Sequence, residues 1–180
     1  VIPASVAGGV GATLTSAGRT LHQGVEFDLR GDLPAMGGLT PFVQVATTWM
    51  PIARFEGERF AFIGTGGADV AGQVYAEQNA AETRTALRVT GNRLPYAPEV
   101  TVTATLGLRH PAGFDLSAEA VHVGRQFGDA ANTNVLVPNG QQGPLAANTL
   151  WNLSANWTSA PLGITVFATV KNVFDELVLV

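Results

Sequence analysis

Cysteine is absent from this 180-residue chain, and charged residues are scarce. Without cysteine the chain can form neither disulfides nor thiolate metal sites, and it has no cysteine nucleophile. Asp, Glu, Lys and Arg make up 13% of the residues, which is about half their usual share in soluble domains. The formal net charge of −4 provides no basic surface, so we expect no nucleic-acid partner.

Long apolar runs are missing as well, although 46% of the residues are hydrophobic. No stretch approaches the ~18 consecutive apolar residues of a transmembrane helix. The 21 glycines and 10 prolines divide the apolar residues into short segments. This composition favours β-structure, in one soluble domain or in a membrane barrel.

Signatures of catalysis and metal binding are also missing. The three histidines, His22, His110 and His122, do not have the spacing of metal ligands. There is no GxSxG motif and no ordered triad signature. The glycine-rich stretch 64–72 lacks the GK[ST] of a phosphate-binding loop, so we interpret it as a flexible loop. We therefore predict no catalytic residue, no bound metal and no cofactor.

Alternation of apolar and polar residues with a period of two is the clearest pattern in the chain, and it predicts β-strands. From Val100 to Leu108 every second residue is apolar, and Thr101, Thr103 and Thr105 lie between them. The pattern predicts six strands: GVEFDLR (24–30), TPFVQVATTWM (40–50), PEVTVTATLGLRH (98–110), FDLSAEA (114–120), LWNLSANWT (150–158) and ITVFATVK (164–171).

Short and long connections alternate between these strands. The short ones, at 31–38, 110–113 and 159–163, are rich in Gly and Pro and read as tight turns. The long ones cover 51–97 and 128–147. We expect the short turns at one end of the sheet and the long loops at the other, an asymmetry typical of membrane barrels. Within the first long loop, 68–87 could hold a short helix, whereas 83–90 reads equally well as a strand.

The position of a membrane does not follow from alternation alone. A soluble barrel turns its apolar face inward, and a membrane barrel turns it outward. Trp49, Trp151 and Trp157 near strand ends fit an interfacial aromatic girdle, but they fit core packing in a soluble β-domain as well. From the segregated loop lengths we predict that the apolar face points outward.

Several stretches resemble one family in the order in which they occur along the chain. They are AGRTLHQGVEFDLR (17–30), GNRLPYAPEV (91–100), VGRQFGDAANT (123–133), NGQQGPLAANTLWNLSANW (139–157) and VKNVFDE (170–176). Together they resemble the C-terminal portion of the barrel of a TonB-dependent outer-membrane receptor. The stretch QFGDAANT, followed by two separated glycines, is most similar to the branch of ferric dicitrate receptors.

The resemblance implies an all-β fold of antiparallel up-and-down strands, with about six strands of a 22-strand transmembrane barrel present here. It also implies that residues 1–180 are the C-terminal part of such a barrel, without the plug domain, the TonB box and the final strand. The chain starts VIPASVAGG, without an initiator Met or a signal segment, so we expect either a mature chain or a piece of a longer one.

As the resemblance implies, whole receptors of this family bind a scarce iron chelate outside the cell and pass it inward with energy from the TonB complex. The implied partners are a ferric chelate or a similar small ligand, the TonB complex acting through the N-terminal part, and the lipid and lipopolysaccharide of the bacterial outer membrane. We expect a receptor rather than an enzyme. Two alternatives are open: a soluble β-sandwich or barrel that binds a ligand or carbohydrate, and a small membrane-barrel enzyme or adhesin.

An anionic iron chelate needs positive charge and hydrogen-bond donors at the mouth of the barrel. The candidate ligand-binding residues lie in loops or near the expected outer ends of strands. They are Arg54, Arg93, Arg125, Gln126 and Asn132. For each of them the alternative is a solvated loop position or a contact with lipopolysaccharide.

Overall fold

The structure is a computed structural model that describes residues 19–56, 60–64, 84–135 and 143–178. Its described residues form ten β-strands and no helix, as the composition predicts. In particular, these residues contain no helix with the length and apolar character needed to cross a membrane.

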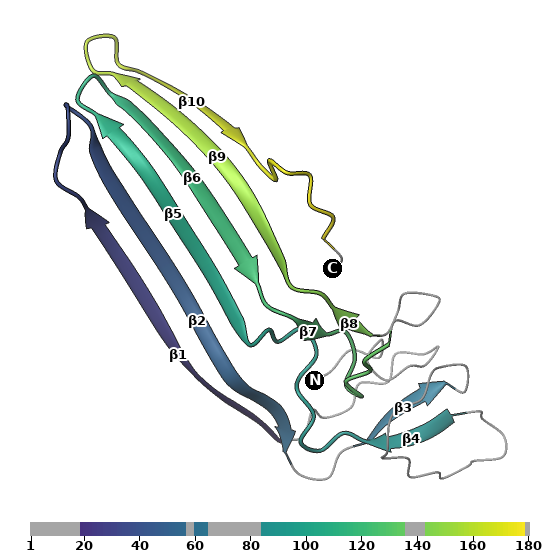
Figure 1. Ribbon diagram of the computed structural model, residues 1–180. Coiled ribbons are helices and arrows are strands. Elements are labelled where there is room, and N and C mark those ends of the chain that lie inside the picture. Colours follow the sequence, from purple (N-terminus) through teal and green to yellow (C-terminus); the bar gives the residue numbers. More distant parts are fainter. Residues whose placement is uncertain (1–18, 57–59, 65–83, 136–142, 179–180) are drawn as a thin grey trace. The chain divides into compact units, whose positions relative to one another are not determined.

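Six strands form one antiparallel sheet (Figure 1). They are β1 (Arg19–Asp32), β2 (Thr40–Glu56), β5 (Val100–His110), β6 (Phe114–Val123), β9 (Asn148–Ser159) and β10 (Ile164–Val170), and they are neighbours in that order. All six predicted strands are confirmed, and β1 and β10 form the two edges of the sheet. The pattern underestimated the length of two strands. β1 begins earlier than the alternation indicates, and β2 ends later.

The chain divides into two compact units. The sheet unit contains the described residues of 25–49, 100–124 and 147–178, and the loop unit contains those of 19–24, 50–99 and 125–146. Two small sheets belong to the loop unit: β3 (Phe60–Gly64) with β4 (Arg84–Arg88), and β7 (Gln126–Phe127) with β8 (Pro144–Leu145). For 84–88 the strand interpretation is confirmed and the helix is wrong. The remainder of the possible helix, 68–83, lies outside the described residues.

Tight turns join the strands at one end of the sheet. The strand order places the connections β1–β2, β5–β6 and β9–β10 at this end, and the long connections leave β2 and β6 at the opposite end. This confirms the expected segregation of the loops. Gly113 shows why the turns contain glycine: its φ is 89°, and a Cβ there would collide with the carbonyl oxygen of Thr158.

Strand register keeps apolar residues beside apolar residues across the sheet. One continuous row runs from β2 to β10 through Val43, Leu106, Ala118, Leu153 and Val170. The adjacent row on the other face contains Gln44, Thr105, Glu119 and Asn152. The sheet therefore has one apolar face and one polar face.

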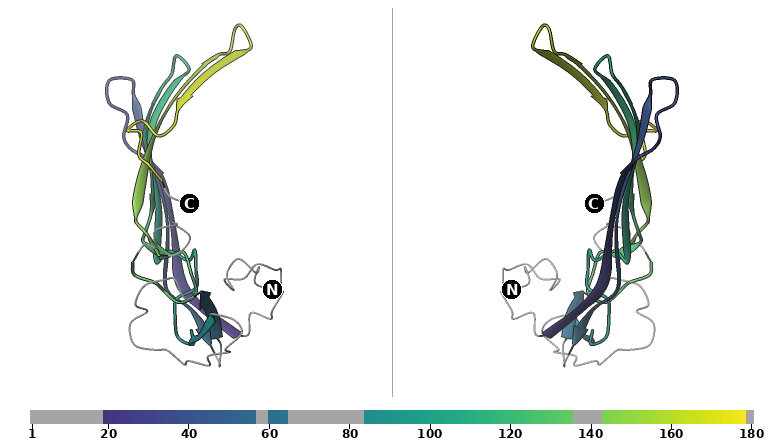
Figure 2. Two further views of the ribbon diagram at one scale, coloured as in Figure 1. Left: turned by 90° about the vertical axis from the view of Figure 1, so that its right-hand side faces the viewer. Right: turned by 90° about the vertical axis from the view of Figure 1, so that its left-hand side faces the viewer.

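The apolar face has no second layer over it among the described residues of the sheet unit. Figure 2 shows the strands of this unit edge-on as a single layer. Leu106 is 60% exposed, Leu153 47% and Trp151 43%. In a soluble sandwich these residues would fill a closed core, and here they do not. Their arrangement therefore agrees with the predicted outward-facing apolar surface.

The polar face carries paired charges near the tight turns. Arg109 Nη1 lies 2.7 Å from Asp32 Oδ1, and its Nε lies 3.8 Å from Asp115 Oδ2. The same guanidinium lies 4.2 Å from the centre of the Phe42 ring. Phe42 in turn occupies the space above Gly107, where a Cβ would collide with the ring. Glycine at this position leaves room for a large ring over the backbone of the polar face.

A charge placed on each face tests this assignment. If the apolar face contacts hydrocarbon, as we predict, Leu153→Arg should lower the free energy of unfolding in phospholipid vesicles by about 2–4 kcal/mol. The matched control is Ser154→Arg on the polar face of the same strand, where we expect a change within about 0.5 kcal/mol. Denaturant titration of the folded protein measures both. Equal losses for the two variants would contradict an apolar face in lipid.

Candidate functional site

The loop unit contains a small packed core. Its buried side chains come from the end of β2, from 89–97 and from 130–133: Ala53, Phe55, Val89, Ala97, Ala130, Ala131 and Thr133. Phe55 is 1% exposed and Val89 is fully buried. Parts of the two long connections therefore pack together around apolar side chains.

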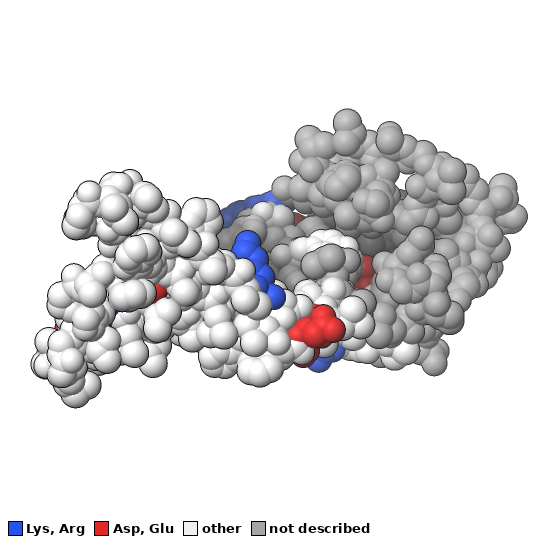
Figure 3. Space-filling view, turned by 90° about the horizontal axis from the view of Figure 1, so that it is seen from above, with Lys and Arg blue, Asp and Glu red and all other residues white. Residues whose placement is uncertain are grey.

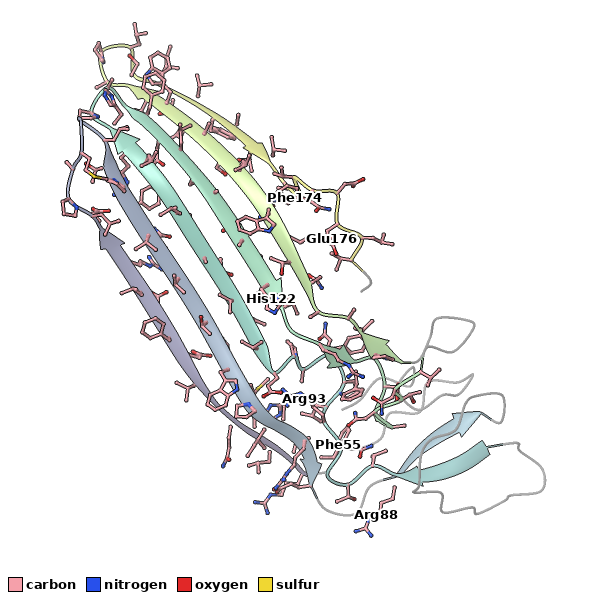
Figure 4. All side chains as sticks on the ribbon, viewed as in Figure 1. Phe55, Arg88, Arg93, His122, Phe174 and Glu176 are labelled. Carbon is pink, nitrogen blue, oxygen red and sulfur yellow. The ribbon has the colours of Figure 1, made fainter. Side chains whose placement is uncertain are left out.

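Arg93 lies beside the end of β2 and binds main-chain carbonyls. The backbone of Arg93 pairs with that of Arg54 in an antiparallel bridge. The guanidinium donates from Nε to the Ala97 carbonyl (2.7 Å), from Nη1 to that of Pro51 (3.1 Å) and from Nη2 to that of Met50 (2.6 Å). Figure 4 labels Arg93 and the buried Phe55. All three nitrogens of the guanidinium are thus engaged within the loop unit.

Asn132 forms a reciprocal pair with the backbone of Arg93. The Arg93 N–H donates to Asn132 Oδ1 (2.7 Å), and Asn132 Nδ2 donates to the Arg93 carbonyl (2.8 Å). Asn132 adopts a left-handed φ of 56°, which Asn tolerates better than most residues. The structure therefore brings together two of the predicted site residues that are 39 positions apart in the sequence.

Asp129 is a central residue that sequence reasoning missed. Its Oδ1 accepts hydrogen bonds from the N–H (3.2 Å) and the hydroxyl (3.1 Å) of Thr133, and its Oδ2 accepts one from the N–H of Gly143 (3.1 Å). An Asp followed by a turn commonly accepts hydrogen bonds from the backbone just beyond it, and this signal could have indicated the local part of the network.

Arg54 and Arg125 present their charges differently from Arg93. The side chain of Arg54 is 49% exposed, and its Nη2 lies 3.9 Å from Glu56 Oε1. Arg125 is exposed, donates to Asn134 Oδ1 (3.0 Å) and lies 5.5 Å from the centre of the Phe127 ring. Both guanidinium groups are accessible to a ligand in solvent.

Gln126 follows Arg125 directly and belongs to β7, where it pairs with Leu145. The next residue, Phe127, accepts a hydrogen bond at its carbonyl from the N–H of Tyr96 (2.9 Å). Tyr96 is 61% exposed and has a left-handed φ of 55°, which is unusual for an aromatic residue. This bond connects the segment of Arg125 and Gln126 to the segment of Arg93.

A separate polar cluster in the sheet unit explains the stretch VKNVFDE. After β10 ends, the Asn172 N–H donates to Asn152 Oδ1 (3.0 Å) instead of to the ladder. The Asn172 side chain then accepts from the Glu176 N–H (2.9 Å) and donates to the Glu176 carbonyl (3.0 Å). Phe174, labelled with Glu176 in Figure 4, meets Trp151 edge-on at 6.3 Å. The stretch is thus a side-chain-closed turn at the end of an edge strand.

Charge is sparse on the described surface. Seen from above in Figure 3, most of that surface is uncharged, and the Lys, Arg, Asp and Glu side chains appear in separate small patches. Among the described residues, no three His, Asp or Glu side chains lie together in a way that could hold a metal ion. The chemistry that the loop unit offers is therefore hydrogen bonding and the charge of its arginines.

Comparison with known proteins gives one match. A family model described as "TonB dependent receptor-like, beta-barrel" matches residues 2–173. Searches of curated proteins and of solved structures returned no match.

The Asn172 turn yields a prediction for the protein folded in detergent micelles. Asn172→Ala removes two hydrogen bonds worth about 1 kcal/mol each and places Ala in a left-handed conformation that costs roughly 1 kcal/mol more. We expect the Glu176 amide to exchange its hydrogen at least ~10-fold faster, as measured by mass spectrometry or NMR. Lys171→Ala, at an exposed neighbouring position, serves as the control and should leave this rate unchanged. Unchanged exchange in Asn172→Ala would mean that the side chain does not close the turn.

Proposed function

Because the chain belongs to the TonB-dependent receptor-like β-barrel family, we propose that its substrate is a ferric chelate, either ferric dicitrate or a related siderophore complex. The family consists of outer-membrane receptors that take up small ligands in dependence on TonB, and its members are transporters rather than enzymes. The described sheet, with one apolar and one polar face, agrees with a segment of such a barrel.

The observation that carries the substrate proposal is the presence of exposed guanidinium groups on a packed loop unit. Arg54 and Arg125 both belong to this unit, and neither is buried by it. Ferric dicitrate and many siderophore complexes present carboxylate or other anionic oxygens, which guanidinium groups bind through charge-assisted hydrogen bonds. We propose that Arg54 and Arg125 contact the chelate and that Gln126 donates a further hydrogen bond.

Direct ligand contact by Arg93 and Asn132 stays a prediction. Both side chains already bind the main chain of the loop unit. A guanidinium has five N–H donors, so Arg93 retains N–H groups beyond the three that these hydrogen bonds use. Asn132 has less remaining capacity, because its Oδ1 and its Nδ2 both face Arg93.

The outer membrane is the second proposed partner, at the apolar face of the sheet. Aromatic residues occur toward both ends of this face: Trp49 and Trp151 on the side of the long loops, and Phe114 stacked on Trp157 (6.0 Å) on the side of the tight turns. Two such groups along the strands are typical of the girdles that lie at the interfaces of a bilayer. We propose that lipid covers the residues between them and that lipopolysaccharide contacts the outer end.

Removing the two exposed arginines tests the substrate. We expect Arg54→Ala/Arg125→Ala to weaken ferric dicitrate binding at least ~10-fold, since hydrogen bonds to charged groups are worth roughly 1.5–3 kcal/mol each. Equilibrium binding to the purified receptor that carries this chain measures the effect. The control Arg88→Ala/Lys171→Ala removes the same net charge elsewhere and should retain binding within about 2-fold. Absence of binding by the unaltered receptor to any ferric chelate would overturn the proposed substrate.

A further inference from the structure

We propose that Asn132, Arg93 and Asp129 are positioning residues that lock the two long connections into one preformed platform for the ligand. The identity of the ligand rests on the proposed function, but the lock itself rests on hydrogen bonds between described residues. The three residues are called the loop clamp below.

Asn132 supplies the contact between the two connections. Its side-chain amide pairs with the N–H and the carbonyl of Arg93 just as a neighbouring strand would, with both distances below 3 Å. A second contact lies alongside, where Asn92 Nδ2 donates to the Ala130 carbonyl (3.0 Å). These hydrogen bonds are part-buried and lie beside the buried residues Ala130 and Thr133, so water competes for them less than it would at an exposed site.

Arg93 extends the clamp to the end of β2. Its three carbonyl partners belong to Met50, Pro51 and Ala97, so one side chain fixes the spacing between 50–51 and 93–97. The planar guanidinium can reach several acceptors in fixed directions, whereas the ammonium of lysine is a compact charge with three donors at one atom. The geometry therefore requires arginine for its shape as well as for its charge.

Asp129 closes the second connection on itself. Three hydrogen bonds join its carboxylate to Thr133 and to Gly143, and the Gly128 N–H donates to the Gly143 carbonyl (3.0 Å). Hydrogen bonds to an ionised carboxylate are about twice as strong as neutral ones. The carboxylate thereby holds residues 129, 133 and 143 together.

The clamp determines where the proposed ligand contacts lie. Arg54 is the bridge partner of Arg93, and Arg125 and Gln126 precede Asp129 by only a few residues. Tyr96, in its strained conformation, ties 125–127 to the same segment as Arg93. A platform that is ordered before the ligand arrives avoids the cost of ordering loops during binding, so the clamp contributes to affinity by positioning Arg54, Arg125 and Gln126.

The experiment compares Arg93→Lys, Arg93→Ala and Asn132→Ala in the receptor that carries this chain, with Val135→Ala at an exposed neighbouring position as the control. Hydrogen exchange of the loop amides is measured first, without ligand. We expect Asn132→Ala to accelerate exchange at the Arg93 amide ~10-fold or more, because that N–H loses its acceptor. Val135→Ala should leave exchange unchanged.

Uptake of ferric dicitrate by cells is measured next. For Asn132→Ala and for both Arg93 variants we expect the half-saturating concentration to rise ~5–10-fold while the maximal rate stays within about 2-fold. Lysine at position 93 keeps the charge but cannot bind the three carbonyls, so Arg93→Lys should resemble Arg93→Ala. Restoration of affinity by lysine would overturn the positioning role and favour a charge contact with the ligand.

The two measurements separate the clamp from the proposed substrate. If the unaltered receptor takes up no ferric chelate, the substrate proposal fails while the exchange rates still decide whether the clamp exists. Unchanged exchange at the Arg93 amide in Asn132→Ala would overturn the clamp whatever the substrate is. A collapse of folding, seen as loss of the heat-stable barrel on gels, would also overturn it, because a positioning residue must leave the barrel intact.

Discussion

The backbone register of the antiparallel sheet is the constraint on which the rest of this structure depends. Side chains alternate between faces with a period of two, so a slip by one residue in any strand would move its whole apolar set to the polar face. From β2 to β9 the register joins Val43, Leu106, Ala118 and Leu153 into one row. One sheet can carry an apolar face and a polar face only because this register is kept through every pair.

Turn chemistry contributes to fixing that register. Gly113 closes the β5–β6 turn with a hydrogen bond from its N–H to the His110 carbonyl (2.9 Å), and its own carbonyl accepts from the Thr158 N–H (2.9 Å). One residue therefore closes a hairpin and extends the pairing with the next strand. Because a side chain at Gly113 would collide with the Thr158 carbonyl, the turn and the register between β6 and β9 are coupled.

The sheet could be predicted from the sequence, whereas most of the loop unit, apart from the strand β4, could not. Alternation is a local signal, and it identified all six long strands together with the arrangement of their connections. The strands β7 and β8 have two residues each, and a strand of this length is too short to show a periodic pattern. Arg93 and Asn132 were identified as candidates by residue type, but their pairing depends on two segments meeting in space. The acceptors of the Arg93 side chain are main-chain carbonyls, which every residue possesses, so no residue type in the sequence marks them.

Three of the stretches that resemble the family contain side chains that bind the main chain. GNRLPYAPEV and VGRQFGDAANT contribute Asn92, Arg93, Asp129 and Asn132, and VKNVFDE contributes Asn172. A strand face can be built from many apolar residues, because lipid requires hydrophobicity and not a particular shape. In a turn with left-handed backbone, few residue types have a side chain that can form the hydrogen bonds a neighbouring strand would otherwise form. The recognisable motifs of this chain are therefore expected where irregular backbone needs specific hydrogen bonds. The proposed ligand contacts Arg54 and Arg125 lie beside this backbone at exposed positions, where their side chains are accessible to a ligand.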